Sequence, residues 1–114
     1  MTARPDKAFY ESREWRERVR PRQLAREPRC EFCLLLGYLV EATTVDHIWR
    51  PFGDHDLRRN PNNLQSLCAE HHLLKSNWER GDCASPLRLG IALSGWPVIW
   101  ERPPKPQPRE PVVM

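Results

Sequence analysis

Two pairs of cysteine and histidine residues constrain this chain more than any other feature. Cys30 and Cys33 are separated by two residues, and Cys68 and His71 repeat that spacing after an interval of 34 residues. The Cys30–Cys33 spacing is that of a knuckle in which two thiolates bind one ion, and Cys68 and His71, three apart on a helix, share one face and can reach the same ion. Three thiolates and one imidazole are a common ligand set for structural zinc. We therefore predict a closed zinc site that stabilises the fold, with buried core cysteines as the competing interpretation.

Cys83 competes with His71 for the fourth ligand position. It follows the predicted helix and has no partner at metal-ligand spacing, whereas His71 is paired with Cys68. We predict that His71 is the ligand and that Cys83 is a free thiol, and both residues remain candidates at this point.

Charge is distributed unevenly along the 114 residues. Residues 1–29 carry nine Lys/Arg against five Asp/Glu (+4), residues 30–85 five against eight (−3), and residues 86–114 four against two (+2), which sums to +3. A basic flank beside an acidic centre fits a phosphate-binding arm next to a cation site. Arg13, Arg16 and Arg20 are the candidate backbone contacts, and a solvated Arg/Glu helix face is the alternative.

Hydrophobic spacing and turn residues predict a small α+β domain. Phe9, Trp15 and Val19 can share one helical face, and Pro21 is expected to end or kink that helix. The expected elements are an interrupted helix over 6–27, two antiparallel strands within 34–40 and 43–48, a loop over 49–63, a helix over 66–79 and an edge strand within 87–93. From Pro103 the proline-rich tail is expected to be extended or disordered.

No apolar run is long enough to span a membrane, and the polar N-terminus does not resemble a signal peptide. The expected location is therefore the cytoplasm, where cysteines are more often metal ligands or free thiols than disulfides.

Asp46 and His47 place a carboxylate next to an imidazole in a β-prone segment. A carboxylate suits a hard divalent cation, and a neutral histidine suits a general base near pH 7. Strict strand alternation would send the two side chains to opposite faces, so a shared site needs a bend or a position at the strand's end.

His72 follows His71 on the predicted helix, where neighbouring side chains point about 100° apart. If His71 binds zinc, His72 faces elsewhere, either as a ligand for a second, exchangeable cation or as an exposed histidine. Lys75 lies three residues after His72 on the same face, where it would meet a phosphate or simply be exposed.

The order of these motifs resembles the HNH endonuclease family. The runs that carry the resemblance are VDHI and, after a polar loop, NNLQSLCAEHHLLK. CEFC matches the zinc-bearing branch of the family, and FYESREW is similar to small HNH proteins associated with bacteriophage genes. The resemblance covers roughly residues 9–79 and implies the ββα-metal fold, in which a hairpin packs on a helix with the active site between them.

The resemblance also implies roles for individual residues. His47 matches the general base, Asn63 the asparagine that braces the loop, and Asp46 and His72 the ligands of one catalytic Mg²⁺, Mn²⁺ or similar divalent ion. Cys30, Cys33, Cys68 and His71 match the zinc positions, although most relatives carry cysteine where this chain has His71. Asn60 and Asn62 compete with Asn63, because any asparagine in this segment can serve turn geometry.

The predicted organisation is a basic helical arm over 1–29, the HNH core with its zinc over 30–82, and an extension with the proline-rich tail over 83–114. The predicted function is hydrolysis of DNA phosphodiester bonds in a bacterial or phage-infected cell. The alternative is a non-catalytic zinc-knuckle module that binds DNA or assists phage DNA packaging, which would leave Asp46, His47, Asn63 and His72 unexplained. Besides DNA, the candidate partners are a phage packaging or host protein and, for double-strand cutting, a second copy of the chain.

Overall fold

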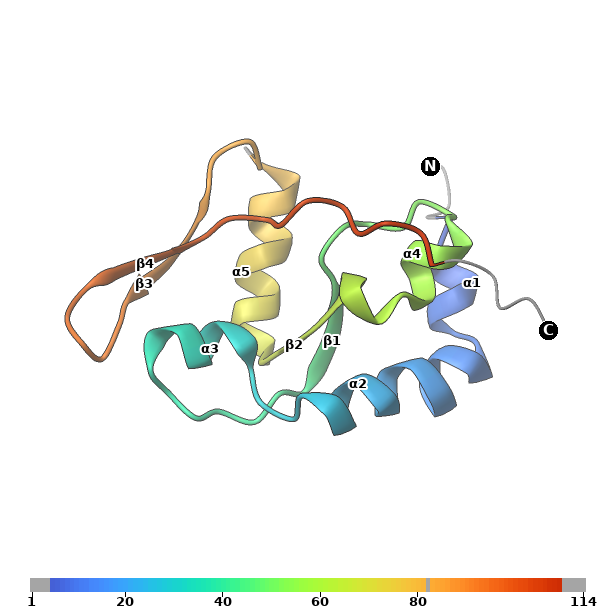
Figure 1. The fold of residues 1–114 in the computed structure, drawn as a ribbon, viewed down its shortest axis with the longest axis horizontal. Coiled ribbons are helices and arrows are strands. Elements are labelled where there is room, and N and C mark those ends of the chain that lie inside the picture. The colour runs from blue at the N-terminus through green and yellow to red at the C-terminus, as the bar shows by residue number, and fades with distance from the viewer. Residues whose placement is uncertain (1–4, 82, 110–114) are drawn as a thin grey trace.

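Two short antiparallel sheets and a set of short helices make up the structure, a computed structural model that describes residues 5–81 and 83–109 (Figure 1). In chain order the elements are α1 (Lys7–Tyr10), the π-helical turn η1 (Trp15–Val19), α2 (Arg20–Arg26), α3 (Glu31–Leu36), β1 (Thr44–His47), α4 (His55–Arg59), the 3₁₀ turn η2 (Pro61–Asn63), β2 (Leu64–Leu67), α5 (Ala69–Arg80), β3 (Leu87–Ile91) and β4 (Pro97–Trp100).

Strands β1 and β2 pair antiparallel and lead directly into helix α5. Their register places Thr44 opposite Leu67 and His47 opposite Leu64. Every residue of β2 is buried, whereas buried and half-buried residues alternate along β1. The predicted α+β class with two antiparallel strands followed by a helix is therefore confirmed.

The prediction that residues 34–40 form the strand that pairs with β1 was wrong. Residues 34–40 do not form a strand, because the apolar run belongs to helix α3, whose N-terminus is capped by the Cys30 sulfur accepting from the Cys33 amide. Gly37 ends the helix at φ 92°, and a Cβ there would lie 3.1 Å from the Cβ of Leu93. A short apolar run of this kind fits a buried strand and a buried helix equally well.

Two further boundaries differ from the sequence expectation. The helix predicted from residue 66 begins at Ala69, because Ser66 and Leu67 belong to β2. The segment 49–63, expected to be a loop, contains α4 and η2, and Asp54 caps α4 by accepting from the Leu57 amide. The first difference arises because β2 is buried on both faces and so lacks the alternation that marks a half-exposed strand.

The N-terminal helices pack against the first sheet. Phe9 and Trp15 are buried in one cluster with Val45 and Leu64, and Val19 packs against it. Pro21 was expected to end or kink the helix, and it does not end it, since α2 continues directly from η1. The wider π-helical turn that precedes the proline removes the need for its missing amide donor and relieves the clash of its ring with the preceding turn.

The second core surrounds helix α3 and the β3–β4 hairpin. Its buried members include Phe32, Leu36 and Leu67, together with Leu87 and Leu89 from β3. The strand expected within 87–93 is confirmed, and it pairs antiparallel with β4. Cys30 and Cys33 belong to this core, and Leu74 and Trp78 of α5 pack against it.

The tail is extended and runs back across α5 to α4 (Figure 1). Trp49 Nε1 donates to the carbonyl oxygen of Pro103 at 2.9 Å, and Arg109 Nε lies 3.0 Å from Asp56 Oδ1. The three-part domain division stays a prediction. Across residues 5–81 and 83–109, no helix has the length and apolar character that a membrane span requires.

Candidate active site and metal centre

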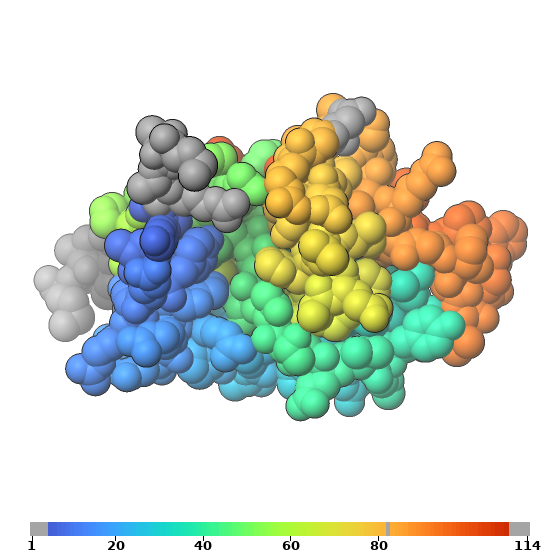
Figure 2. Space-filling view, turned by 180° about the vertical axis from the view of Figure 1, so that it is seen from behind, coloured from blue at the N-terminus to red at the C-terminus, as the bar shows by residue number. Residues whose placement is uncertain are grey.

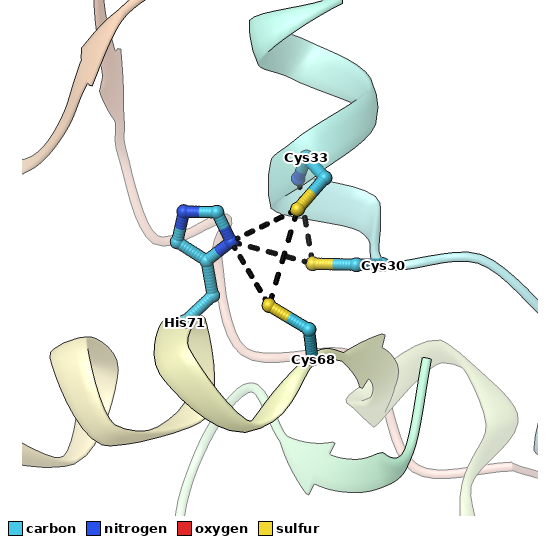
Figure 3. A group of neighbouring side chains, drawn as sticks. All are labelled: Cys30, Cys33, Cys68 and His71. Atoms are coloured by element: carbon cyan, nitrogen blue, oxygen red, sulfur yellow. Dashed lines mark hydrogen bonds between the residues drawn. The ribbon is translucent and has the colours of Figure 1, made fainter. Parts of the chain in front are cut away.

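Four potential metal ligands meet between α3 and the start of α5 (Figure 3). Cys30 and Cys33 come from the N-terminal end of α3, and Cys68 and His71 from the first turn of α5. His71 Nδ1 lies 3.4 Å from the Cys30 sulfur, 3.3 Å from the Cys33 sulfur and 3.4 Å from the Cys68 sulfur. All four donor atoms lie within 4.8 Å of one another.

These distances fit a tetrahedral metal site. Ligands bound to zinc at about 2.3 Å for sulfur and about 2.0 Å for nitrogen would lie about 3.5 to 3.8 Å apart. Burial and the neighbouring thiols raise the pKa of Cys33 to about 12, so its thiolate form needs a nearby positive charge. Cys83 is exposed and lies outside the group, which leaves His71 as the fourth donor.

A cleft opens between the N-terminal helices and α5, with β1 at its base (Figure 2). Its volume is about 500 Å³, and all four residues of β1 line it. The cleft therefore follows the unpaired edge of the strand, where side chains from both faces are accessible. This geometry resolves the expected conflict, because Asp46 and His47 lie on opposite faces of β1 and still reach one cavity together with His72.

His47 is held at the end of β1 by contacts on both ring nitrogens. Nε2 donates to the carbonyl oxygen of Arg58 at 3.0 Å, and Nδ1 accepts from the Tyr10 hydroxyl at 2.9 Å. His47 is 5% exposed, and its ring stacks on Trp15 with the ring centres 5.4 Å apart. Burial lowers the pKa of His47, so the imidazole is neutral near pH 7 with its lone pair on Nδ1.

Asp46 points to the other side of the strand, toward α5. Its Oδ2 lies 2.6 Å from Lys75 Nζ and accepts from Gln65 Nε2 at 3.0 Å. Its Oδ1 lies 3.6 Å from His72 Nε2. One carboxylate oxygen is thus engaged by protein donors, while the other faces a histidine whose side chain is 40% exposed.

The expectation that Lys75 lies on a surface where it meets a phosphate was wrong. Lys75 is fully buried, and its ammonium contacts Asp46 Oδ2, Glu79 Oε1 at 3.0 Å and the carbonyl oxygen of His47 at 2.9 Å. Two carboxylates and a carbonyl attract the ammonium inward, and all three of its hydrogens have partners. Lys75 therefore connects the two residues of the Asp46–His47 pair to helix α5.

Asn63 is fully buried beneath the segment that follows β1. Its Oδ1 accepts from the Trp49 amide, and its Nδ2 donates to the carbonyl oxygens of Trp49 and Leu57, each at 2.9 Å. These bonds fix the chain between His47 and α4. Asn60 is also buried, but its Oδ1 accepts from the Asn62 amide within the turn.

The predicted arginine contacts do not all reach the cleft. Arg20 lines it, and its Nη2 donates to the carbonyl oxygen of Thr43 at 2.9 Å. Arg13 and Arg16 are exposed on the outer surface of the helix, where Arg13 pairs with Glu17 at 3.3 Å. Arg50, which the sequence did not single out, also lines the cleft, and its side chain is 45% exposed.

Tyr10 is the other site residue that sequence reasoning missed. It lies 37 residues from His47 in the chain, and no spacing rule relates the two. Burial, followed by the charges of Asp6 and Asp46, raises the pKa of Tyr10 to about 12, so its hydroxyl is a donor at neutral pH. The available signal was its position one residue after Phe9, which anchors the N-terminal helix in the core.

Comparison with known proteins yields one informative match. Neither a protein-family model nor a curated protein matches the sequence. Among solved structures, the chain is similar to the crystal structure of an HNH endonuclease from the deep-sea thermophilic bacteriophage GVE2 with manganese ion, at 40% identity and a TM-score of 0.59. The match covers 65% of this chain and 80% of that one. The likeness of fold and sequence confirms the resemblance inferred from the motifs, and the chain belongs to the HNH endonuclease family.

Proposed function

We propose that the chain is a metal-dependent endonuclease that hydrolyses DNA phosphodiester bonds. The observation that carries this proposal is the gathering of Asp46, His47 and His72 around one cleft, although two of them are neighbours on opposite faces of a strand. The similar phage endonuclease was solved with manganese, which supports a divalent cation as the cofactor.

His47 is the proposed general base. Because Nε2 donates to a carbonyl oxygen, the lone pair is on Nδ1, which faces the cleft and the Tyr10 hydroxyl. When water replaces the Tyr10 hydroxyl at this lone pair, Nδ1 accepts a proton from that water, and the resulting hydroxide forms a bond to phosphorus. The bond from phosphorus to the 3′ oxygen breaks, and that oxygen takes a proton from solvent, which leaves 5′-phosphate and 3′-hydroxyl ends.

Asp46 Oδ1 and His72 Nε2 are the proposed ligands of the catalytic cation. Neighbouring ligands of an octahedral Mg²⁺ or Mn²⁺ with bonds of about 2.1 Å lie about 3 Å apart, and these two atoms are 3.6 Å apart. A divalent cation bound there supplies charge stabilisation to the phosphate and the departing oxygen. Lys75 and Gln65 hold the other carboxylate oxygen and so fix the direction of Oδ1.

The Cys30–Cys33–Cys68–His71 group is the proposed structural zinc site. Four protein donors fill a tetrahedral coordination shell and leave no position for water or substrate. Asn63 is the proposed brace of the base, since its three side-chain hydrogen bonds hold the chain that follows His47. Arg20 and Arg50 are the proposed phosphate contacts, which position DNA without reading its sequence.

Plasmid nicking by the full chain with Mn²⁺ or Mg²⁺ tests the proposal. His47→Ala is expected to reduce the rate about 10²- to 10⁴-fold, the usual contribution of a general base. His55→Ala is the matched control, because His55 is exposed on α4 away from the cleft. Equal rates for wild type and His47→Ala would exclude His47 as the base. Metal-independent DNA binding without cleavage under any cation would favour the non-catalytic module instead.

A further inference from the structure

Phe52 has an unusual conformation for an aromatic residue. Its φ is 46°, and among the non-glycine residues in the described part of the chain it alone has a positive φ. The left-handed region is disfavoured for bulky L-residues, so the surrounding structure must impose it. The side chain gains no burial in return, because the residue is 70% exposed.

The turn that carries Phe52 is anchored at several points. Gly53 N donates to Asp6 Oδ1 at 3.0 Å, and Asp54 N donates to the carbonyl oxygen of Pro51 at 2.9 Å. Asp6 is 7% exposed and also accepts from Arg58 Nε at 2.8 Å. The phenyl ring is therefore presented to solvent by a fixed backbone, which favours a binding role over a loose loop.

The position of the ring suggests what it binds. Phe52 lines the same cleft as His47, at its rim, and lies two residues after Arg50. An arginine that can contact a phosphate beside an exposed aromatic ring is the combination that proteins use for single-stranded nucleic acid. Arg20 also lines the cleft and adds a second positive charge, while the lining carboxylates are paired with basic side chains, so a polyanion suits this cleft better than an apolar partner.

We propose that Phe52 is a stacking platform for an unpaired nucleobase next to the scissile phosphate. The proposal rests on the proposed function, which places that phosphate beside His47. Bases inside a duplex are stacked on one another, so the ring is available mainly to single-stranded or locally unpaired DNA. Stacking does not distinguish among bases, because each has a π face, and the platform therefore selects DNA structure and not sequence.

Binding of fluorescein-labelled DNA by the full chain, without added divalent cation, tests this role separately from cleavage. Phe52→Ala is expected to weaken binding of a single strand about 5-fold to about 150-fold, the usual range for loss of one base–aromatic stack. Binding of a duplex of the same length is expected to change less than about 2-fold. Phe52→Trp should restore single-strand binding, and Phe52→Leu should not.

Two controls separate stacking from other effects. Trp96→Ala removes an aromatic side chain that is 74% exposed on the distant hairpin, and it should leave binding unchanged. A strand of abasic deoxyribose phosphates should bind wild type and Phe52→Ala equally. Unchanged single-strand affinity in Phe52→Ala, or restoration by leucine, would overturn the platform.

The outcomes also separate this proposal from the proposed function. If nicking depends on His47 but Phe52→Ala binds single strands normally, the stacking role of Phe52 is overturned and the proposed nuclease function remains. If single-strand binding depends on Phe52 but no cation supports cleavage, the nuclease assignment fails, and base stacking on Phe52 is retained without a scissile phosphate beside it.

Discussion

Lys75→Met is the substitution that most directly tests the charge arrangement beneath the candidate active site. Lys75 is fully buried, and its ammonium lies 2.6 Å from Asp46 Oδ2 and 3.0 Å from Glu79 Oε1. It also donates to the carbonyl oxygen of His47 at 2.9 Å. Methionine has a similar length and apolar stem, so the substitution removes the charge and three hydrogen bonds with little change in packing.

The expected loss of stability follows from the burial of both partners. The side chains of Asp46 and Glu79 are 12% and 9% exposed, so removing Lys75 leaves two carboxylates with little access to water. Breaking one buried ion pair costs about 3 to 5 kcal/mol. Glu79 keeps Arg102 at 2.9 Å, so we expect about 3 to 5 kcal/mol in total and not twice that value. The free energy of unfolding of small domains is about 5 to 15 kcal/mol, so this loss would remove a large part of the stability.

Urea unfolding of the zinc-loaded protein, followed by tryptophan fluorescence, measures this loss. Lys7→Met is the matched control, because Lys7 is exposed on α1 and its substitution should change stability by less than about 0.5 kcal/mol. The double variant Lys75→Met with Asp46→Asn should recover part of the loss, since the amide removes one of the orphaned charges. A loss below about 1 kcal/mol for Lys75→Met would refute the interpretation that this ammonium neutralises the buried carboxylates.

Three further predictions concern the metal and the base. Chelation should unfold the chain, and measured zinc content should fall in Cys33→Ala and persist in Cys83→Ala, because metal binding and folding are coupled at such sites. Burial lowers the pKa of His47 from its ordinary value of about 6.5. The nicking rate should therefore stay constant from pH 7 to below about 6.5 and fall only when His47 is protonated at lower pH. A fall in rate that begins at or above about pH 6.5 would contradict this reasoning. Tyr10→Phe frees Nδ1 from a hydrogen bond of about 0.5 to 1.5 kcal/mol and should therefore raise the nicking rate about 2- to 10-fold, whereas a slower variant would show that the hydroxyl assists catalysis.

The group of three cysteines and one histidine was predictable because its signal is local. The spacing of Cys30 to Cys33 and of Cys68 to His71 is meaningful on any helix or turn, and the structure brings the two pairs together. The strand that pairs with β1 was not predictable in the same way. Residues 64–67 are buried on both faces, so their sequence lacks the period-two alternation of a half-exposed strand.

The buried position of Lys75 had no sequence signal of its own. Lysines are mostly exposed, and the groups that attract this one include Asp46 and His47, 29 and 28 residues earlier in the chain. The position of Tyr10 also had no sequence signal of its own, because Tyr10 contacts His47 only when the N-terminal helices pack on the first sheet. Local spacing thus identified the candidate ligands, whereas tertiary packing decides which polar side chains lie beneath the cleft and which line it.

The two proposed metal sites are mechanically connected through one turn of helix α5. His71 and His72 are neighbours, so their side chains diverge by about 100° and serve the cysteine group and the cleft respectively. Cys68 and His71 fix both ends of that turn when they bind a metal, and this fixes the direction of His72. In this arrangement the proposed closed site also sets the orientation of His72, a proposed ligand of the open one. Lys75, one turn further along the helix, fixes Asp46 from the same element, so α5 orients both proposed ligands of the catalytic cation.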